Sequence, residues 1–239
     1  EAGHDRFDYG LVERLLPGYI DTDQLRLLAG EAALNMTRLA LKLAGYVNGV
    51  ALRHAETTRR MFPGYRIRAV TNGVHLPTWA HPAFAALYSK HFPSWGHDPE
   101  VLALAYQIPS DAVWGAHDRA KRDLVAAIAA RSGVTFDPAK PIIGYARRMT
   151  SYKRPELLFT DLDALRRINR NLPFQIVLAG KAHPQDEPGK REIQHIHGHI
   201  AALRDSLPIA FVPNYDLDVA KALVSGVDVW LNTPQPPME

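Results

Sequence analysis

The sequence predicts an α/β protein, with a mostly helical first part and a parallel β-sheet in the second. Beyond Pro138, short apolar runs rich in β-branched residues alternate with amphipathic helical segments, and the connections are short. Such alternation is typical of consecutive β-α-β units, in which the strands are parallel and each crossover is right-handed. With 239 residues and 46% hydrophobic content, the chain can bury a substantial core in one or two domains.

The first part of the chain has helical patterns interrupted by turn residues. Pro17 and Gly18 separate two short helices, and Asp21 or Thr22 can cap the second. The third helix has so little polar face that we expect it to be buried inside a larger body. The predicted helices span residues 9–16, 22–29, 35–46 and 50–62.

A strand, an irregular region and a long helix connect this part to the sheet. Residues 65–70 alternate apolar and basic side chains, which predicts a strand. Residues 77–110 are rich in Pro, His and Trp and are expected to hold only short helical pieces, and residues 111–131 form the next helix. We place a domain boundary within residues 108–137, so that the two parts are residues 1–110 and 111–239.

Beyond Pro138, the second part is predicted to contain four strands and three helices. The strands are residues 141–145, 174–179, 209–212 and 227–232, and the helices are residues 155–169, 188–203 and 217–225. The loops after the carboxyl ends of parallel strands lie at one edge of the sheet, where such proteins bind ligands. We therefore expect the polar residues of these four loops to converge.

The loop after the first of these strands contains four cations, Arg147, Arg148, Lys153 and Arg154, and we name residues 147–154 the cation segment. Pro155 and Glu156 favour a helix that begins immediately after it. The backbone N–H groups and dipole of a helix start, together with Arg and Lys, form a binding place for an oxyanion. The alternative is a solvated basic turn. We favour the anion site because it lies at the ligand-binding edge of the sheet.

Composition and spacing argue against several other functions. A net charge of +3 without a basic tract does not predict nucleic-acid binding. The absence of cysteine rules out disulfides and thiolate metal sites and fits a reducing, cytoplasmic location. No apolar run is long enough to span a membrane. Of His195, His197 and His199, only the first and last share a helix face, so no metal site is predicted.

Separated motifs throughout the chain resemble those of the α-glucan phosphorylases, which comprise the glycogen, starch and maltodextrin phosphorylases. The segment YARRMTSYKR, residues 145–154, is similar to the arginine- and lysine-containing phosphate segment of that family. The further matches, in the same order, are VNGVA at 47–51, TNGV at 71–74, AGKA at 179–182, Asn214 with Tyr215, and VDV at 227–229. The AGHDRF opening and the VDVWLNTP segment are most similar to the shorter bacterial branch.

This resemblance implies a GT-B fold. Residues 1–110 then form the helical end of the amino-terminal domain, and residues 111–239 form the first half of a Rossmann-like carboxyl-terminal domain. The implied reaction is retaining phosphorolysis of α-1,4-glucan or maltodextrin by inorganic phosphate, with release of glucose 1-phosphate. The implied cofactor is pyridoxal phosphate, whose phosphate group exchanges a proton with the substrate phosphate. A homo-oligomer is compatible with this family.

The resemblance also implies roles for individual residues. Arg148 and Lys153 are assigned to the substrate phosphate and the pair of phosphate groups, since a guanidinium chelates two oxygens and an ammonium is a point charge. Arg147 and Tyr215 are assigned to the cofactor. Asp216, however, stands where the longer phosphorylases carry arginine, so the charge near the cofactor differs.

Three further residues match contacts to the sugar. His54 matches a histidine whose backbone carbonyl contacts the sugar, and the alternative is a helix histidine satisfied within the core. Glu239 matches a glutamate that hydrogen-bonds the glucose hydroxyls. Asp118 falls near an asparagine that contacts the sugar, and the alternative is a side chain that faces solvent.

The family's Schiff-base lysine follows the glutamate matched by Glu239, so it is expected beyond the last residue of this sequence. The chain also starts without an initiator Met and stops after a proline-rich turn. We therefore expect an internal fragment that is inactive alone. Two alternatives stay open. One is a GT-B nucleotide-sugar glucosyltransferase of the glycogen-synthase type, whose Arg and Lys have the same spacing, and the other is a non-catalytic glucan-binding module.

Overall fold

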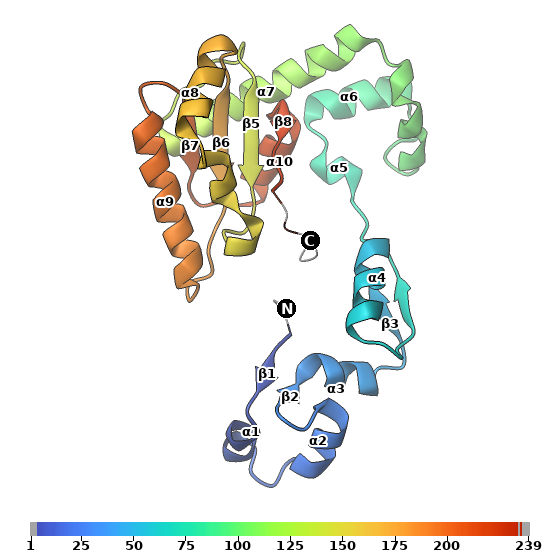
Figure 1. The fold of residues 1–239 in the computed structure, drawn as a ribbon. Helices are drawn as coiled ribbons and strands as arrows, with labels where there is room; N and C mark the ends of the chain where they lie inside the picture. The colour runs from blue at the N-terminus through green and yellow to red at the C-terminus, as the bar shows by residue number, and fades with distance from the viewer. Residues whose placement is uncertain (1–3, 234, 236–239) are drawn as a thin grey trace. The chain divides into compact units, whose positions relative to one another are not determined.

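The computed structural model describes residues 4–233 and 235, and the chain divides into two compact units between Val74 and His75 (Figure 1). In the first unit the helices are α1 (Tyr9–Leu15), α2 (Thr22–Ala29), α3 (Met36–Leu43) and α4 (Leu52–Met61). Strands β1 (Arg6–Phe7) and β2 (Leu34–Asn35) are antiparallel, and β3 (Val47–Gly49) and β4 (Ile67–Ala69) are parallel. The four predicted helices and the predicted strand at residues 65–70 are thus confirmed.

Side-chain caps explain where two of these helices begin. The Asp21 carboxylate accepts hydrogen bonds from the backbone N–H groups of Asp23 and Gln24, which confirms it as the cap of α2. Asn35 caps α3 in the same way, so this helix starts one residue later than predicted. It also ends at Leu43, earlier than the predicted residue 46. Leu43 is 66% exposed, so the expected burial of this helix is not seen in this structure.

A small core holds the first two helices together. It consists of Tyr9, Val12, Leu25, Ala29 and Leu34. The buried Tyr9 hydroxyl donates a hydrogen bond to the Gly30 carbonyl over 2.6 Å, so its polar end is satisfied.

Strand β3 was not predicted, because Asn48 and Gly49 usually form turns. In the structure Gly49 lets the backbone of β3 approach α4 closely. A Cβ atom at Gly49 would lie only 2.8 Å from the Ala55 nitrogen. The strand therefore depends on a contact with a later helix, which local sequence does not reveal.

The second unit contains further α-helices and also 3-10 helices, which are labelled η. They are α5 (Leu76–Trp79), α6 (Pro82–His91), η1 (Pro99–Gln107), α7 (Ser110–Ser132), η2 (Ser151–Lys153), η3 (Pro155–Phe159), α8 (Leu162–Asn171), α9 (Glu187–Leu203) and α10 (Leu217–Gly226). The first three confirm the short helical pieces predicted for residues 77–110. Within the described part of the chain, no helix has the length and hydrophobicity needed to cross a membrane.

Contacts with later helices bring α5 and α6 into the second unit. The His81 Nε2 atom before α6 lies 2.9 Å from Asp123 Oδ2 on α7, and the Ser225 hydroxyl of α10 donates to the Trp79 carbonyl over 3.3 Å. The division between the compact units consequently lies earlier in the chain than the boundary expected within residues 108–137.

The second unit is built around a four-stranded parallel sheet, as predicted. Its strands are β5 (Ile142–Ala146), β6 (Gln175–Ala179), β7 (Ile209–Val212) and β8 (Val229–Trp230), in the order β7-β6-β5-β8. The chain moves in one direction from β5 to β7 and then returns to place β8 on the other side of β5. This is the order of the first four strands of a doubly wound sheet, with the change of direction between β5 and β8.

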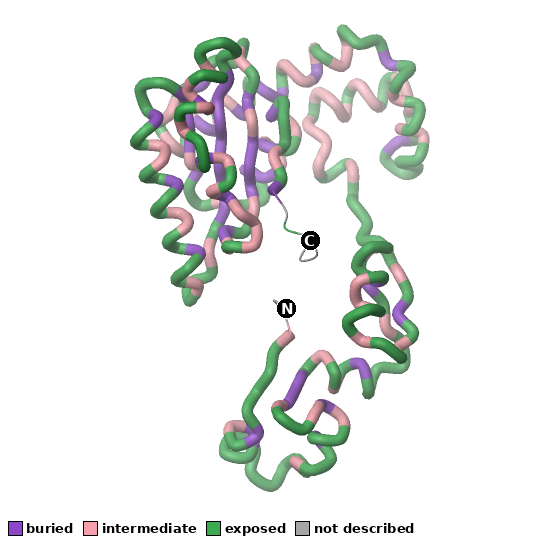
Figure 2. Tube along the Cα trace, viewed as in Figure 1, coloured by how far each residue is buried: buried purple, intermediate pink, exposed green. Residues whose placement is uncertain are grey.

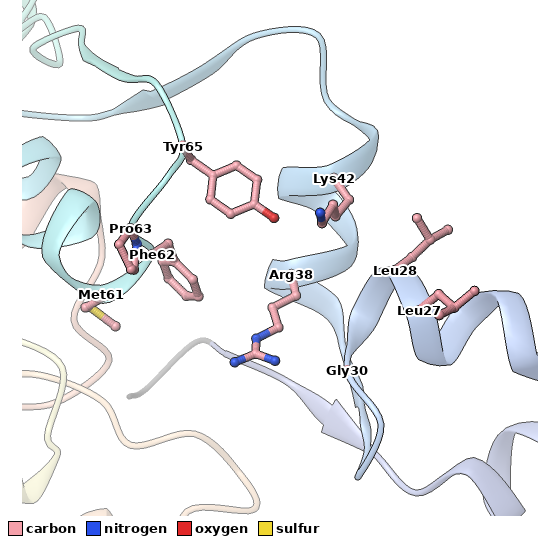
Figure 3. A pocket seen from close by; sticks show the side chains of 9 residues that line it. All are labelled: Leu27, Leu28, Gly30, Arg38, Lys42, Met61, Phe62, Pro63 and Tyr65. Atoms are coloured by element: carbon pink, nitrogen blue, oxygen red, sulfur yellow. The ribbon is translucent and has the colours of Figure 1, made fainter.

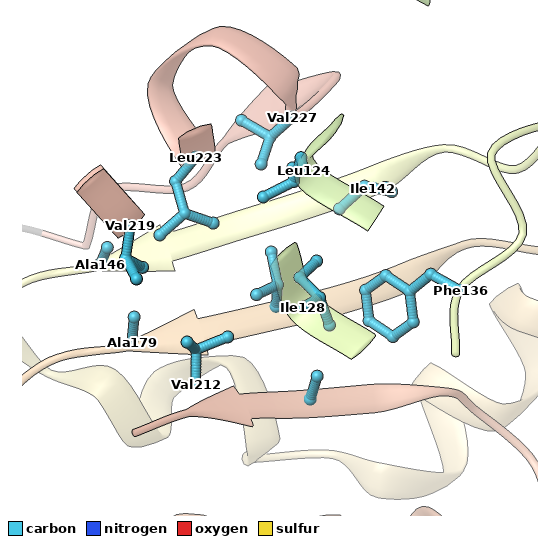
Figure 4. Packing of buried hydrophobic residues seen from close by; sticks show 12 residues of the cluster. Leu124, Ile128, Phe136, Ile142, Ala146, Ala179, Val212, Val219, Leu223 and Val227 are labelled. Atoms are coloured by element: carbon cyan, nitrogen blue, oxygen red, sulfur yellow. The ribbon is translucent and has the colours of Figure 1, made fainter. Parts of the chain in front are cut away.

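Helices cover both faces of this sheet, and its strand β6 is buried along its whole length (Figures 1 and 2). On one face, Leu124 of α7 and Leu223 of α10 pack against strand residues such as Val212 (Figure 4). On the other face, Leu165 of α8 and Ile196 of α9 belong to a second buried cluster. The sheet is thus the middle of three layers.

The helix predicted for residues 155–169 is wrong at its start. Residues 155–159 form η3 instead, and α8 begins at Leu162, because the Asp161 carboxylate accepts a hydrogen bond from the Ala164 N–H over 2.7 Å. Arg154 immediately before η3 has a left-handed backbone, with φ of 49°. The cation segment is therefore not followed directly by an α-helix, and a helix dipole does not explain its chemistry.

Candidate functional site

The loops after β5 and β8 meet at the carboxyl edge of the sheet. The Arg147 guanidinium donates a hydrogen bond to the Asn232 side-chain oxygen. The Thr233 hydroxyl donates to the backbone carbonyl of Lys153 over 2.7 Å. This meeting place is the point at which the strand order changes direction, where open α/β sheets bind ligands.

The loop after β6 supports the cation segment from the other side. Arg147 N–H donates to the Ala179 carbonyl over 3.3 Å, and Met149 N–H donates to the Lys181 carbonyl over 3.1 Å. Gly180 lies between these two carbonyls. A Cβ atom at Gly180 would lie 2.1 Å from the Arg147 carbonyl oxygen, so only glycine allows the two loops to approach this closely. The loops after β5, β6 and β8 therefore converge, and these are three of the four predicted loops.

Two arginines of this segment lie close enough to Lys153 to act on its charge. Burial lowers the pKa of Lys153, and the charges of Arg147 and Arg148 lower it further. Arg148 is exposed, and within residues 4–233 and 235 its guanidinium makes no hydrogen bond or ion pair. A bound anion would offset the mutual repulsion of these cations. The segment is thus a concentrated positive site at the ligand edge of the sheet.

Arg154 differs from the other cations in its orientation. Its Nε atom donates to the Thr233 carbonyl over 3.2 Å, so the side chain turns toward the loop after β8. It helps to hold the segment together.

The segment also contains a buried hydroxyl without a partner. Among the described residues, the Thr150 Oγ1 atom is buried and has no hydrogen-bond partner. Thr150 lies between Arg148 and Lys153 in the sequence. The dense positive charge of the neighbouring Arg and Lys side chains fits the recognition of phosphate oxygens. These residues therefore fit the phosphate group of pyridoxal phosphate as well as inorganic phosphate.

Tyr215 lies after β7, which is separated from β5 by β6. Its ring packs against the core cluster of α7 and α10, and burial raises the pKa of its hydroxyl. The neighbouring Asp216 caps α10 by accepting the Val219 N–H over 2.9 Å, and it also binds Arg131 over 2.8 Å. These two hydrogen bonds lower the pKa of Asp216, so its negative charge is already compensated by Arg131.

The residues predicted to contact sugar are placed in different parts of the chain. Asp118 lies on α7, where its carboxylate binds Arg122 over 2.6 Å. His54 lies on α4 of the first unit, and its backbone carbonyl accepts a hydrogen bond from the Thr58 hydroxyl over 2.7 Å. Glu239 lies outside the described residues. Their contacts to sugar stay predictions.

Sequence reasoning assigned no individual role to Tyr145, Asn232 or Thr233. Tyr145 is a buried strand residue, and the other two follow β8. The strand order contains the signal that could have found them, because in a doubly wound sheet the first and fourth strands are neighbours.

A separate concavity in the first unit has no predicted site residue (Figure 3). It has a volume of about 310 Å³, and its lining includes Arg38, Lys42 and Tyr65 beside apolar side chains such as Leu27 and Phe62. The cation segment is therefore the candidate site with the strongest support from both sequence and structure.

Comparison with known proteins shows which family this chain resembles. A family model described as carbohydrate phosphorylase matches residues 11–233. Maltodextrin phosphorylase from Thermococcus litoralis is 34% identical, over 100% of this chain and 32% of that protein. Glycogen phosphorylase from Aquifex aeolicus is 38% identical, over 86% of this chain and 34% of that protein.

Glycogen phosphorylase from Mycobacterium tuberculosis is 34% identical over 100% of this chain and 33% of that protein. The chain thus spans about a third of the length of these relatives. The family match includes the whole cation segment and Thr233. The chain therefore belongs to the carbohydrate phosphorylase family.

Proposed function

We propose that the gene product containing this chain is an α-1,4-glucan phosphorylase with a GT-B fold. It would cleave glucan or maltodextrin with inorganic phosphate and release glucose 1-phosphate with retained configuration. Family membership and the names of the relatives support this proposal. The observation that carries it is the cation segment, where the charges of Arg147 and Arg148 act on Lys153 at the ligand edge of the sheet.

In this proposal the cations bind and orient phosphate. The exposed Arg148 guanidinium offers two parallel N–H groups to the oxygens of the substrate phosphate. Lys153 supplies a point charge between phosphate groups. An anion beside Lys153 raises its pKa again, so the ammonium stays protonated when phosphate is bound. Such preorganised charge lowers the cost of bringing anions together.

The residues assigned to the cofactor are Arg147 and Tyr215. Pyridoxal phosphate, when bound, supplies a phosphate group that exchanges a proton with the substrate phosphate. Arg147, oriented by its hydrogen bond to Asn232, would bind oxygens of that group. Tyr215 would contact the cofactor through its hydroxyl, whose pKa is raised by burial.

Other parts of the proposal follow from the resemblance. His54, Asp118 and Glu239 are assigned to the sugar, and residues 1–110 and 111–239 to the two domains. The protein is expected in the cytoplasm, as a homo-oligomer or a monomer, without nucleic-acid or membrane partners. We also expect a polypeptide of residues 1–239 to release no glucose 1-phosphate on its own.

The test is an assay of the gene product with maltoheptaose and inorganic phosphate. We expect phosphate-dependent release of glucose 1-phosphate and an absorption band that borohydride reduces. Arg148→Ala is expected to lower kcat/KM for phosphate about 100-fold, because a charged oxyanion contact is lost. Arg167→Ala, which removes an exposed arginine of α8, is the matched control and should leave the rate unchanged.

Two outcomes would contradict this function. Glucan elongation from a nucleotide sugar, without a pyridoxal band, would favour a glucosyltransferase. Glucan binding without any turnover would favour a non-catalytic module. A wild-type rate in Arg148→Ala would overturn the role of that residue alone.

A further inference from the structure

Two buried hydroxyl groups hold the backbone at the end of the cation segment. The Tyr145 hydroxyl donates to the Lys153 carbonyl over 3.1 Å. The Thr233 hydroxyl lies 2.7 Å from the same carbonyl and 3.1 Å from the Arg154 carbonyl. Tyr145 is 1% exposed and Thr233 is 9% exposed, so neither side chain is placed to touch a ligand in solution.

These hydroxyls flank the one strained residue of the segment. Arg154 has φ of 49° and ψ of 54°, a left-handed conformation that is unfavourable for a residue with a side chain. Such a conformation persists only where the surroundings fix it. The Lys153 and Arg154 carbonyls belong to the peptide groups on either side of the Arg154 Cα atom, and the single Thr233 hydroxyl proton is shared between them, with the shorter contact to Lys153.

The arrangement ties together two neighbouring strands. Tyr145 is in β5, and Thr233 follows β8. The Arg154 Nε atom donates back to the Thr233 carbonyl over 3.2 Å, so hydrogen bonds run in both directions between the two loops. The position of Lys153 thus depends on the loop after β8 as well as on its own.

We propose that Tyr145 and Thr233 are positioning residues, whose hydroxyls fix the turn at Arg154 and thereby place the Lys153 ammonium for phosphate. This inference rests on the proposed phosphate-binding role of the cation segment. Neither residue acts on the reacting atoms. Their effect passes through the backbone of Lys153 and Arg154.

The position of Lys153 can be followed without turnover. Its pKa is lowered by burial and by the nearby charges of Arg147 and Arg148, and it therefore reports where the ammonium lies. The rate at which acetic anhydride modifies Lys153, measured against pH by mass spectrometry of the gene product, gives this pKa. In the wild type we expect a midpoint below the ordinary value of about 10.4.

The informative variants are Thr233→Val and Tyr145→Phe, which remove a hydroxyl and keep the shape. In each we expect the Lys153 midpoint to rise by about half a unit or more, because the ammonium moves away from the arginines. We also expect KM for inorganic phosphate to rise about tenfold with a smaller change in kcat, since a carbonyl partner is lost.

Two controls separate positioning from general loss of structure. Thr233→Ser keeps the hydroxyl and should retain the wild-type midpoint and KM. Thr160→Val removes a hydroxyl that donates to the Leu157 carbonyl over 3.1 Å, outside the cation segment, and should change neither value. If Thr233→Val fails to fold, Tyr145→Phe tests the inference alone, because its ring still fills the core.

The inference is overturned if a folded Thr233→Val or Tyr145→Phe keeps the wild-type Lys153 midpoint and phosphate KM. It is also overturned if Thr233→Ser behaves like Thr233→Val. The variants could shift the Lys153 midpoint while the wild-type gene product shows no phosphorolysis. That result would support the positioning role and contradict the proposed function. The two conclusions are therefore tested separately.

Discussion

Asp228 shows how one carboxylate fixes the strand that completes the cation site. Its oxygens accept hydrogen bonds from the backbone N–H of Ile142 and the ammonium of Lys121, both over 2.7 Å, and from His117 Nε2 over 3.0 Å. Burial raises the pKa of Asp228, but these three hydrogen bonds together hold it below its ordinary value. The carboxylate is therefore ionised at neutral pH and joins the start of β8 to β5 and α7.

The first prediction concerns the pH dependence of this contact. Because the folded-state pKa of Asp228 is lowered, its stabilising contribution is present above the unfolded value of about 3.9 and is lost as pH falls through the folded pKa. Asp228→Asn removes the charge at every pH. We expect the difference in free energy of unfolding between wild type and variant to be largest near neutral pH and to shrink in acid.

Urea unfolding of a polypeptide of residues 1–239 between pH 3 and pH 7 measures this difference. Asp163→Asn is a suitable control, because the Asp163 side chain is 78% exposed and its ion pair with Arg166 contributes little. A difference between wild type and Asp228→Asn that does not change with pH would contradict the account.

At the scale of elements, sequence patterns predicted what is set locally. Apolar residues recur at one spacing in strands and at another in helices, and both spacings are visible in the sequence. The strand predicted at residues 209–212 therefore has the bounds of β7. The start of α8 was missed, because Asp161 and the left-handed Arg154 compete with the helix signal of Pro155 and Glu156. β3 was missed because its pairing depends on distant residues.

The same limit applies to the site. Arg148 and Lys153 were predicted because cations after a buried strand are visible in the sequence. Their supports, Asn232 and Thr233, come from about 80 residues further along the chain, at separations of 85 for Arg147 to Asn232 and 80 for Lys153 to Thr233. Only the three-dimensional order of the strands brings them together.

The second prediction concerns the approach of two loops at Gly180. In Gly180→Ala the added Cβ would overlap the Arg147 carbonyl, which is backbone and must shift. We expect a loss of about 2 to 3 kcal/mol in the free energy of unfolding and weaker phosphate binding, because the cation segment is displaced. Urea unfolding and calorimetric titration with inorganic phosphate measure the two effects.

Gly133→Ala is the matched control for this change. Gly133 has φ of 72° after α7, and a Cβ atom added there would meet no atom within 4 Å. Gly133→Ala should lower the free energy of unfolding by only about 1 kcal/mol, because alanine is less favourable than glycine at positive φ. It should leave phosphate binding unchanged. Equal losses in the two variants would show that backbone conformation, and not the close approach, makes Gly180 necessary.

At the scale of the whole molecule, the two units differ in how much core each one has. Among its described residues, the first unit has one small buried cluster, and it exposes large apolar side chains such as Leu15, Leu27 and Leu52. The described part of the second unit has two buried clusters, one on each face of its sheet. Stability that comes from burial should therefore be unequal between the units.

The third prediction follows from this inequality. In a polypeptide of residues 1–239, we expect backbone amides of α1 to α4 to exchange with deuterium faster than those of β5, β6 and α7. Hydrogen exchange followed by mass spectrometry of peptides measures this directly. Uniform protection across both units would contradict it, and proteolysis within residues 70–76, which join them, provides a second test.

The return of the chain to β8 also has a consequence for synthesis on the ribosome. The cation segment is translated about 80 residues before Asn232 and Thr233, the partners that hold Arg147, Lys153 and Arg154 in place. Until β8 emerges and closes this long loop, the charged segment cannot take its final shape. In the proposed function, the anion site would therefore be completed only after the fourth strand has joined the sheet.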